Sequence, residues 1–279
     1  MLSSTQIDRL GNRLRSGDHT ADDLRSLDEY RRSFGNAYES VLERVRRKQH
    51  PSTGRPAKST RSIAEKLRRE SIRLSQMQDI AGCRIVVPDI LEQETYLGYL
   101  RNEFKTAIVV DRRENPSFGY RAVHVIPVID GKDVEIQVRS VLQHLWAELS
   151  EKASDVLDPS IKYGGGIPEW QMFFKLTSAY LARYEEMQIA AFNEIKVRAE
   201  LKRENVRLSE MVAEARASGA TGQKLVSLKY WAERSSKRIA QGERLSRREE
   251  ADRLKKHDRI ERSLRNAIVM LDRKKEQPK

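Results

Sequence analysis

The spacing of apolar residues changes twice along this chain, and that change is the strongest constraint on its fold. Between residues 80 and 139, apolar residues gather in short runs rich in Val and Ile, which is typical of β-strands. On either side of this stretch they recur every three or four positions, as they do on amphipathic helices. The pattern predicts one α/β or α+β sheet domain with helical segments before and after it.

Four segments are predicted to be strands, and the connection between the last two is specific. The strands are Ile80–Val87, Ala107–Val110, Ala122–Ile129 and Val134–Arg139. Asp130-Gly131 separates the last two, and this dipeptide favours a type I′ turn between antiparallel neighbours. Helices are predicted at Ser62–Arg69 and Leu91–Phe104, whereas Pro51–Gly54 is predicted to be a turn.

Periodicity and charge divide the rest of the chain. One helix, broken near Gly35, is predicted over residues 24–45, and a helical stripe runs from Trp170 to Ile195. The net charge of +12 is concentrated in residues 220–279, which hold 18 Lys and Arg against 9 Asp and Glu, after a break at Ser218–Gly222. We therefore predict a helical region over 1–50, a sheet domain over 51–166, a helical extension over 167–219 and a basic helical tail over 220–279.

The composition excludes several classes of protein. No apolar run approaches the roughly 18 residues of a membrane span, and the N-terminal segment has no apolar secretory core, so a cytoplasmic protein is expected. The single cysteine, Cys83, excludes an intramolecular disulfide and a multi-cysteine zinc site, so a bound metal must use oxygen or imidazole ligands. The positive charge favours an anionic partner such as a nucleotide or a nucleic acid.

Carboxylates occur at two places on the predicted sheet. Alternation in the last strand puts Glu135, Gln137 and Arg139 on one face, and Asp79 stands at the start of the first strand. Two such carboxylates can hold Mg²⁺ through their oxygens and leave room for phosphate oxygens. The alternatives are a solvated strand face and a capping role for Asp79.

Cations and an aromatic ring accompany these carboxylates. Lys58, Ser62 and Lys66 are spaced by four and would line one face of a helix that starts that early, where they could hold a triphosphate. In the Gly-hinged loop Ser117–His124, Tyr120 could stack on a base. A solvated helix face and an ordinary strand start are the alternatives.

Together and in this order, the motifs resemble the synthetase domain of the RelA/SpoT alarmone family over about residues 50–165. The resemblance rests on Gly54–Lys58 with Ser62 and Lys66, Asp79–Ile85, Gly119–His124 and Glu135–Arg139. It implies an α+β fold with a mixed five-stranded sheet flanked by helices. The family commonly has its first Arg and Lys two residues apart, whereas Arg55 and Lys58 are three apart here.

The resemblance also implies a role for each motif residue. Asp79 would bind Mg²⁺, and Glu135 would be a second metal ligand or the general base. The phosphates of the donor ATP would be held by Arg55, Lys58, Ser62, Lys66 and Arg84. The acceptor nucleotide would be bound by Tyr120, whose ring stacks on guanine, and by His124, Gln137, Arg139 and His144.

In this family, the β,γ-pyrophosphate of ATP is transferred to the ribose 3′-hydroxyl of GDP or GTP, which gives guanosine tetra- or pentaphosphate. The chain length resembles that of a small single-domain alarmone synthetase. One alternative is a toxic family member that pyrophosphorylates the 3′-CCA end of tRNA, which the basic tail would favour. Another is a non-catalytic nucleotide- or RNA-binding module. Small members are often homo-oligomeric, and the stripe from Trp170 to Ile195 offers a surface for that. The alternative is that the stripe packs on the sheet domain of the same chain.

Overall fold

The computed structural model describes residues 2–219 and 223–276, and these form two compact units. Of the described residues, the first unit comprises 2–181 with 270–276, and the second comprises 182–219 with 223–269. Part of the predicted break at Ser218–Gly222, residues 220–222, lies outside the described residues. Over the described ranges, no helix is both long enough and apolar enough to cross a membrane.

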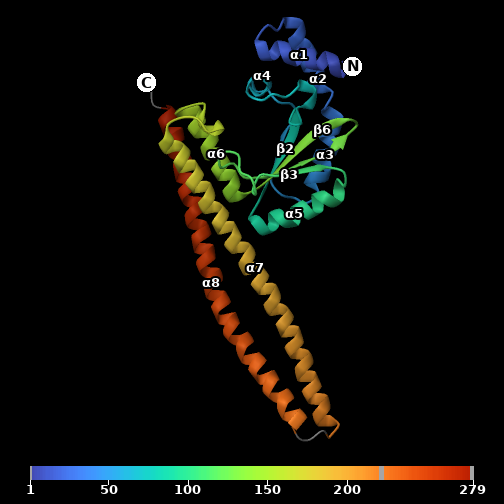
Figure 1. Ribbon diagram of the computed structural model, residues 1–279, viewed down its shortest axis with the longest axis vertical. Coiled ribbons are helices and arrows are strands. Elements are labelled where there is room, and N and C mark those ends of the chain that lie inside the picture. The colour runs from blue at the N-terminus through green and yellow to red at the C-terminus, as the bar shows by residue number, and fades with distance from the viewer. Residues whose placement is uncertain (1, 220–222, 277–279) are drawn as a thin grey trace. The chain divides into compact units, whose positions relative to one another are not determined.

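The first unit is built on a mixed sheet with the strand order β1-β2-β6-β4-β3 (Figure 1). Its strands are β1 (Ser52–Arg55), β2 (Ala81–Val87), β3 (Ile108–Asp111), β4 (Val123–Ile126), β5 (Val128–Ile129) and β6 (Lys132–Ser140). The central strands β2 and β6 run parallel, and all other neighbours run antiparallel. The α+β fold with a mixed sheet is confirmed, and the short β5 is a sixth strand that pairs with β6.

The hairpin before β6 follows from local chemistry. Asp130 and Gly131 both have positive φ, 51° and 70°, as a type I′ turn requires, so the predicted hairpin is confirmed. The single strand predicted over Ala122–Ile129 is wrong in one respect, because the chain forms two strands separated at Pro127. Proline has no backbone N–H to continue the ladder.

Helices cover the sheet on both sides. In the first unit they are α1 (Ser4–Ser16), α2 (Ala21–Arg32), α3 (Gly35–Arg46), α4 (Thr60–Arg69), α5 (Ile90–Glu103), α6 (Val141–Val156) and the 3₁₀ turns η1 (Leu74–Gln76) and η2 (Ile161–Tyr163). α3 and α5 lie on one side of β2 and β6, and α6 lies on the other (Figure 1). The Tyr96 hydroxyl of α5 donates to the Val45 carbonyl of α3 at 2.9 Å. The apolar face of β6, with Ile136 fully buried, lies in this core.

At the N-terminal side, one local prediction is wrong and another is confirmed. The predicted turn at Pro51–Gly54 is wrong, because Ser52–Arg55 form β1, which pairs with β2. Gly54 packs closely on Tyr38, since a Cβ at this position would lie 1.8 Å from the Tyr38 hydroxyl oxygen and would displace that ring. The predicted break near Gly35 separates α2 from α3, and α1 was not predicted.

The second unit is made of segments of two long helices, α7 (Pro168–Ala217) and α8 (Gln223–Glu276). They run antiparallel, because residues nearer the C-terminal end of α7 contact residues nearer the N-terminal end of α8. The Tyr184 hydroxyl donates to the Arg253 carbonyl at 3.1 Å, and Asn205 donates to Ser236 at 2.9 Å. Of the predicted basic helical tail, residues 223–276 form one 54-residue helix.

Candidate active site

One face of the sheet centre carries polar side chains. Across the ladder, Glu135 of β6 pairs with Gly82 of β2, and Gln137 pairs with Arg84 on one side and with His124 of β4 on the other. Directly paired residues point to the same face of a sheet. Gly82 allows the close approach beside Glu135, because a Cβ there would lie 2.5 Å from the Glu135 carbonyl oxygen. A cavity of about 140 Å³ is lined by Thr53, Gly54, Arg55, Gly82, Cys83, Arg84, Glu135 and Gln137.

Asp79, just before β2, is the centre of a cationic cluster. Its two carboxylate oxygens accept hydrogen bonds from Lys58 Nζ at 2.6 Å and from Lys66 Nζ at 3.0 Å. Arg55 donates to the Asp79 backbone carbonyl at 2.9 Å. Burial alone would raise the pKa of Asp79, but the charges and hydrogen bonds of the two lysines outweigh it and hold the pKa at about 2. Asp79 is therefore a carboxylate at neutral pH.

Lys58 lies outside the helix on which it was predicted to share a face with Ser62 and Lys66. α4 begins at Thr60, so Lys58 precedes the helix, and its backbone N–H donates to the Ile80 carbonyl at 2.7 Å. Ser62 lies in the first turn of α4, where its backbone N–H and hydroxyl are bonded to the N-cap Ser59. The structure brings Arg55, Lys58 and Lys66 together at Asp79, whereas Ser62 bonds to Ser59 at the N-terminus of α4.

Glu135 is held on both of its oxygens. His124 Nδ1 lies 2.9 Å from Oε1, and Gln137 Nε2 donates to Oε2 at 2.6 Å. Burial would raise the pKa of Glu135, but these contacts with His124 and Gln137 lower it below its ordinary value, while the charge of Asp79 opposes them. Glu135 is therefore an ionised carboxylate in a fixed orientation, available to bind a cation or to take a proton from a hydroxyl placed beside it.

The Tyr120 ring closes the other end of the polar face. Its hydroxyl lies 3.0 Å from His124 Nε2 and accepts from Arg139 Nη2 at 3.0 Å, and the Arg139 guanidinium lies 5.0 Å from the ring centroid. The side chain is half-buried rather than displayed on an open loop. The preceding Gly119 has φ of 92°, and a Cβ there would lie 2.7 Å from the Trp146 ring, so only glycine fits this turn.

Three side chains on this polar face, Arg84, Arg139 and His144, have buried nitrogen atoms without a hydrogen-bond partner in the described part of the chain. Among the described residues, Arg84 Nε, Arg139 Nε and Nη1, and His144 Nδ1 are buried and have no hydrogen-bond partner. Burial lowers the pKa of His144, and the positive charges of Arg84 and Arg139 lower it further. Burial and Arg139 likewise lower the pKa of Arg84. Unsatisfied buried polar atoms are costly, so this corner is suited to an anionic or polar ligand.

The predicted metal ligands fit a magnesium ion by chemistry. Asp79 and Glu135 supply carboxylate oxygens, the ligand type that Mg²⁺ prefers, and they lie near enough for one charge to shift the pKa of the other. Over the residues that the structure covers, no group of three or more His, Cys, Asp or Glu side chains could hold a metal ion. A magnesium ion here would thus need oxygens from a polyphosphate substrate as well, which is how Mg²⁺ is commonly bound.

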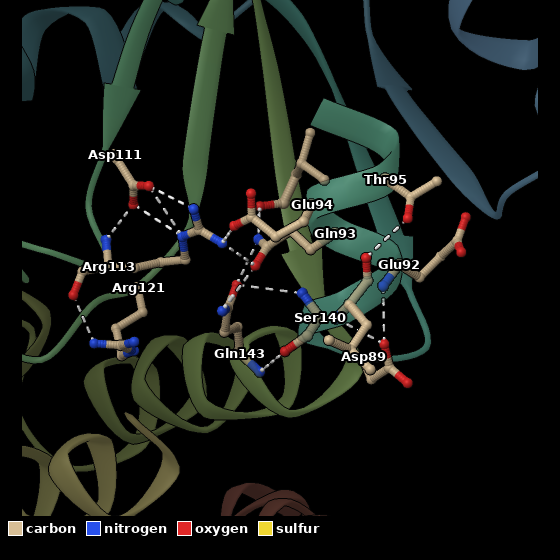
Figure 2. A network of polar contacts seen from close by, with 12 residues as sticks. Asp89, Glu92, Gln93, Glu94, Thr95, Asp111, Arg113, Arg121, Ser140 and Gln143 are labelled. Carbon is tan, nitrogen blue, oxygen red and sulfur yellow. Dashed lines mark hydrogen bonds and ion pairs between the residues drawn. The ribbon is translucent and has the colours of Figure 1, made fainter. Parts of the chain in front are cut away.

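Sequence reasoning missed a buried network behind the Tyr120 loop. Figure 2 shows Gln93 of α5 and Gln143 of α6 facing each other, joined by reciprocal amide hydrogen bonds of 2.9 and 3.2 Å. Gln93 also donates to the Val138 carbonyl at 2.8 Å. A signal was present, because Gln93 lies at helical spacing from Ile90 and Leu97 and so falls on the buried face of α5.

Arginine side chains extend this network to both ends of the loop (Figure 2). The Arg113 guanidinium contacts both carboxylate oxygens of Asp111, and its Nη1 donates to Glu94 at 2.5 Å and to Gln93 at 3.2 Å. Arg121, next to Tyr120, donates to the Arg113 carbonyl at 2.7 Å. The network therefore fixes residues 113 and 121, between which the loop runs.

Comparisons with known proteins find a family model and several relatives that match part of this chain. Residues 54–154 match the family model described as "Region found in RelA / SpoT proteins". Uncharacterized proteins of Mycobacterium bovis and Mycobacterium tuberculosis are each 34% identical over 170 residues, which cover 58% of this chain and 62% of theirs. The guanosine-3′,5′-bis(diphosphate) 3′-pyrophosphohydrolase of Aquifex aeolicus is 37% identical over 95 residues, 31% of this chain and 13% of that protein.

Among solved structures, small alarmone synthetase 1 of Bacillus subtilis bound to its product pppGpp is similar, with a TM-score of 0.48 and 24% identity. The match covers 62% of this chain and 98% of that chain. The chain thus matches about 62% of the length of its mycobacterial relatives. The resemblance seen in the motifs is confirmed for residues 54–154, which match the region found in RelA/SpoT proteins.

Proposed function

From a RelA/SpoT-type domain with this polar face, we propose that the chain transfers the β,γ-pyrophosphate of ATP to the ribose 3′-hydroxyl of GDP or GTP. The products would be AMP and guanosine tetra- or pentaphosphate. The observation that carries the proposal is one sheet face that joins a lysine-bound carboxylate, Asp79, to a second carboxylate, Glu135, held by His124 and Gln137. Pyrophosphoryl transfer needs both charge neutralisation and a base, and this face has groups for each.

The donor end is assigned to the cationic cluster around Asp79. Lys58 and Lys66 each carry three N–H donors, of which Asp79 uses only some, and half of the Arg55 side chain is exposed. These groups can contact equatorial phosphate oxygens of ATP, where negative charge accumulates during transfer. Mg²⁺, held by Asp79 and Glu135 together with phosphate oxygens, would supply further charge neutralisation when bound.

The acceptor end is assigned to the Tyr120 corner. A guanine base stacked on the Tyr120 ring would lie near Arg139, Gln137 and His144, which offer hydrogen-bonding atoms. His144 Nδ1 and Arg139 Nη1 have no partner within the described residues and are free to recognise the acceptor. Because the pKa of His144 is lowered, its ring is neutral at pH 7 and can accept a hydrogen bond.

Glu135 is assigned the proton transfer. Its carboxylate takes the proton of the 3′-hydroxyl as the oxygen attacks the β-phosphorus of ATP, the bond between that phosphorus and the α,β-bridging oxygen breaks, and AMP leaves. His124 and Gln137 orient the carboxylate through the contacts at 2.9 and 2.6 Å. A positioned base of this kind contributes about 100- to 10,000-fold in rate.

The test uses ATP labelled in its β,γ-phosphates with GDP, GTP or deacylated tRNA as the acceptor. We expect label on the guanine nucleotide, and Glu135→Gln should lower the rate by about 100- to 10,000-fold while ATP binding remains measurable by calorimetry. The matched control is Glu114→Gln, an exposed acid of the same domain, which should retain activity.

Three outcomes would contradict parts of this proposal. Label on tRNA alone would show that the acceptor is a tRNA end, as in the toxic members of the family. Nucleotide binding without transfer to any acceptor would show a non-catalytic module. Equal activity of the wild type and Glu135→Gln would show that Glu135 is not the base.

A further inference from the structure

In the second unit, helix α8 carries a row of positively charged side chains. Four exposed cations lie at helical spacing along one face, with exposed Gln241 between them; they are Arg234, Lys237, Arg244 and Arg248, and we call them the cationic ridge. Over the described residues, none of the four forms an ion pair with an acidic side chain. The ridge spans about 21 Å at 1.5 Å per residue. It is therefore an uncompensated, extended positive surface.

A pair of exposed aromatic rings stands at one end of the ridge. Tyr230 and Trp231 are 53% and 57% exposed, and their ring centroids lie 5.6 Å apart. Arg234 donates to the Tyr230 hydroxyl at 2.7 Å, and its guanidinium carbon lies 5.9 Å from each ring centroid. The first cation of the ridge thus connects it to the aromatic pair.

We propose that the cationic ridge and the aromatic pair bind a single-stranded nucleic acid. The phosphates contact the ridge, and an unpaired base stacks on Trp231. Basic tracks joined to aromatic platforms are the general means of binding single strands, since every base has a stacking face. A hollow of about 430 Å³ along the ridge, lined by Lys237, Ala240, Gln241 and Arg244, gives the backbone a path.

The other anionic surfaces fit less well. A helix that lies on a membrane needs an apolar face beside its cations. Among the described side chains between Arg234 and Arg248, no large apolar one is exposed. An acidic protein would satisfy the ridge but gives no role to two neighbouring exposed rings, whereas a nucleic acid uses both features.

The test measures anisotropy of a labelled short oligouridine titrated with the full chain, without ATP or guanine nucleotide. It is therefore independent of the proposed pyrophosphate transfer, and either proposal can fail alone. We expect binding that weakens steeply with KCl, with a log–log slope of about −3 for four phosphate contacts. Trp231→Ala should weaken binding roughly ten-fold or more with the slope unchanged, because it removes stacking and no charge.

Charge is tested with two variants of equal net charge. The ridge variant R234Q/K237Q/R244Q/R248Q should lose most of the affinity and most of the salt slope. The control variant K196Q/R203Q/R207Q/R216Q removes four exposed cations from α7, where acidic residues alternate with them, and should bind nearly as the wild type does. Circular dichroism at 222 nm checks that both variants remain helical.

Several results would overturn the proposal. Equal loss in the ridge and control variants would mean that only net charge matters. Equal affinity for a duplex of the same length, with no effect of Trp231→Ala, would exclude base stacking. Binding to phosphatidylserine vesicles but not to oligouridine or the matching oligodeoxythymidine would assign the ridge to lipid. Binding to polyglutamate alone would assign it to an acidic protein.

Discussion

At the scale of the residue, Asp79 shows how partners decide what a carboxylate does. Burial opposes its charge, yet Lys58 and Lys66 keep it ionised with a pKa of about 2. Burial lowers the pKa of Lys58, whereas the charge and the hydrogen bond of Asp79 oppose that shift, so Asp79 favours the charged form of Lys58 as Lys58 favours that of Asp79. At Cys83, burial of the thiol raises its pKa to about 12, which leaves it protonated and unreactive at neutral pH.

We predict that Asp79 makes stability depend on pH in the acid range. Its folded pKa of about 2 lies below the ordinary 3.8, so the stabilisation is present above about pH 4 and is lost as pH falls toward 2. In urea titrations, the free energy of unfolding of the wild type should fall between pH 6 and pH 2 by about 2 kcal/mol more than that of Asp79→Asn. It should also destabilise the protein at pH 7, because two lysines lose their partner.

The control for this prediction is Asp22→Asn, which alters an exposed pair with Arg25. A surface pair contributes at most about 1 kcal/mol, so the acid dependence should stay as in the wild type. An Asp79→Asn protein with the full wild-type acid dependence would contradict the assignment.

Tyr120 gives a second prediction at this scale. If the ring stacks on the acceptor base, Tyr120→Leu should raise the KM for the acceptor roughly 5- to 100-fold, whereas Tyr120→Phe keeps the stack. Tyr120→Phe loses only the hydroxyl contacts to His124 and Arg139 and should show a smaller change. Steady-state kinetics with acceptor and ATP varied separately would check this. Equal KM values for Tyr120→Leu and the wild type would rule out the stacking role.

At the scale of the element, the loop between β3 and β4 depends on helices distant in sequence. Arg113 at its start contacts Asp111 and Glu94, and Arg121 at its end donates back to Arg113 (Figure 2). The contacts with Gln93 of α5 make the loop a fixed platform for Tyr120. No spacing rule in the loop itself indicates this support, because the supporting residues lie on other elements.

We predict that Arg113→Gln loosens this loop. The substitution removes the guanidinium contacts to Asp111 and Glu94 and should cost about 1–3 kcal/mol in urea unfolding. The acceptor KM should rise more than kcat falls, since Tyr120 is positioned through the loop. The neighbouring Arg112 is exposed, so Arg112→Gln is the matched control and should change stability by less than about 0.5 kcal/mol. Identical behaviour of the two variants would contradict the network's role.

At the scale of the whole molecule, the two units differ in how far burial protects their backbone amides from exchange with solvent. The first has a sheet whose central strands β2 and β6 are enclosed by helices, with side chains such as Ile85 and Ile136 fully buried. The second consists of two helical segments with sparse buried apolar residues, among them Val212, Ile260 and Leu264. Helices of that kind open locally at low cost.

This difference predicts the pattern of amide hydrogen exchange. Peptides from β2 and β6 should exchange slowest, while peptides from 196–216 and 229–250 should exchange faster by orders of magnitude. Exchange followed by mass spectrometry on the full chain measures this directly. Uniform protection across both units would show that the second unit has a more stable core than its buried residues indicate.

The sequence by itself determined the periods of the elements, the Asp130-Gly131 hairpin, the basic tail and the order of the motifs, because each depends on neighbours along the chain. Only the tertiary structure decided that Ser52–Arg55 pair with β2, that Lys58 reaches Asp79 from outside α4, and that Gln93 supports the Tyr120 loop. These depend on contacts between residues 20 or more positions apart. Local propensity carries no information about such pairings, since their free energy exists only once the sheet and its helices have assembled.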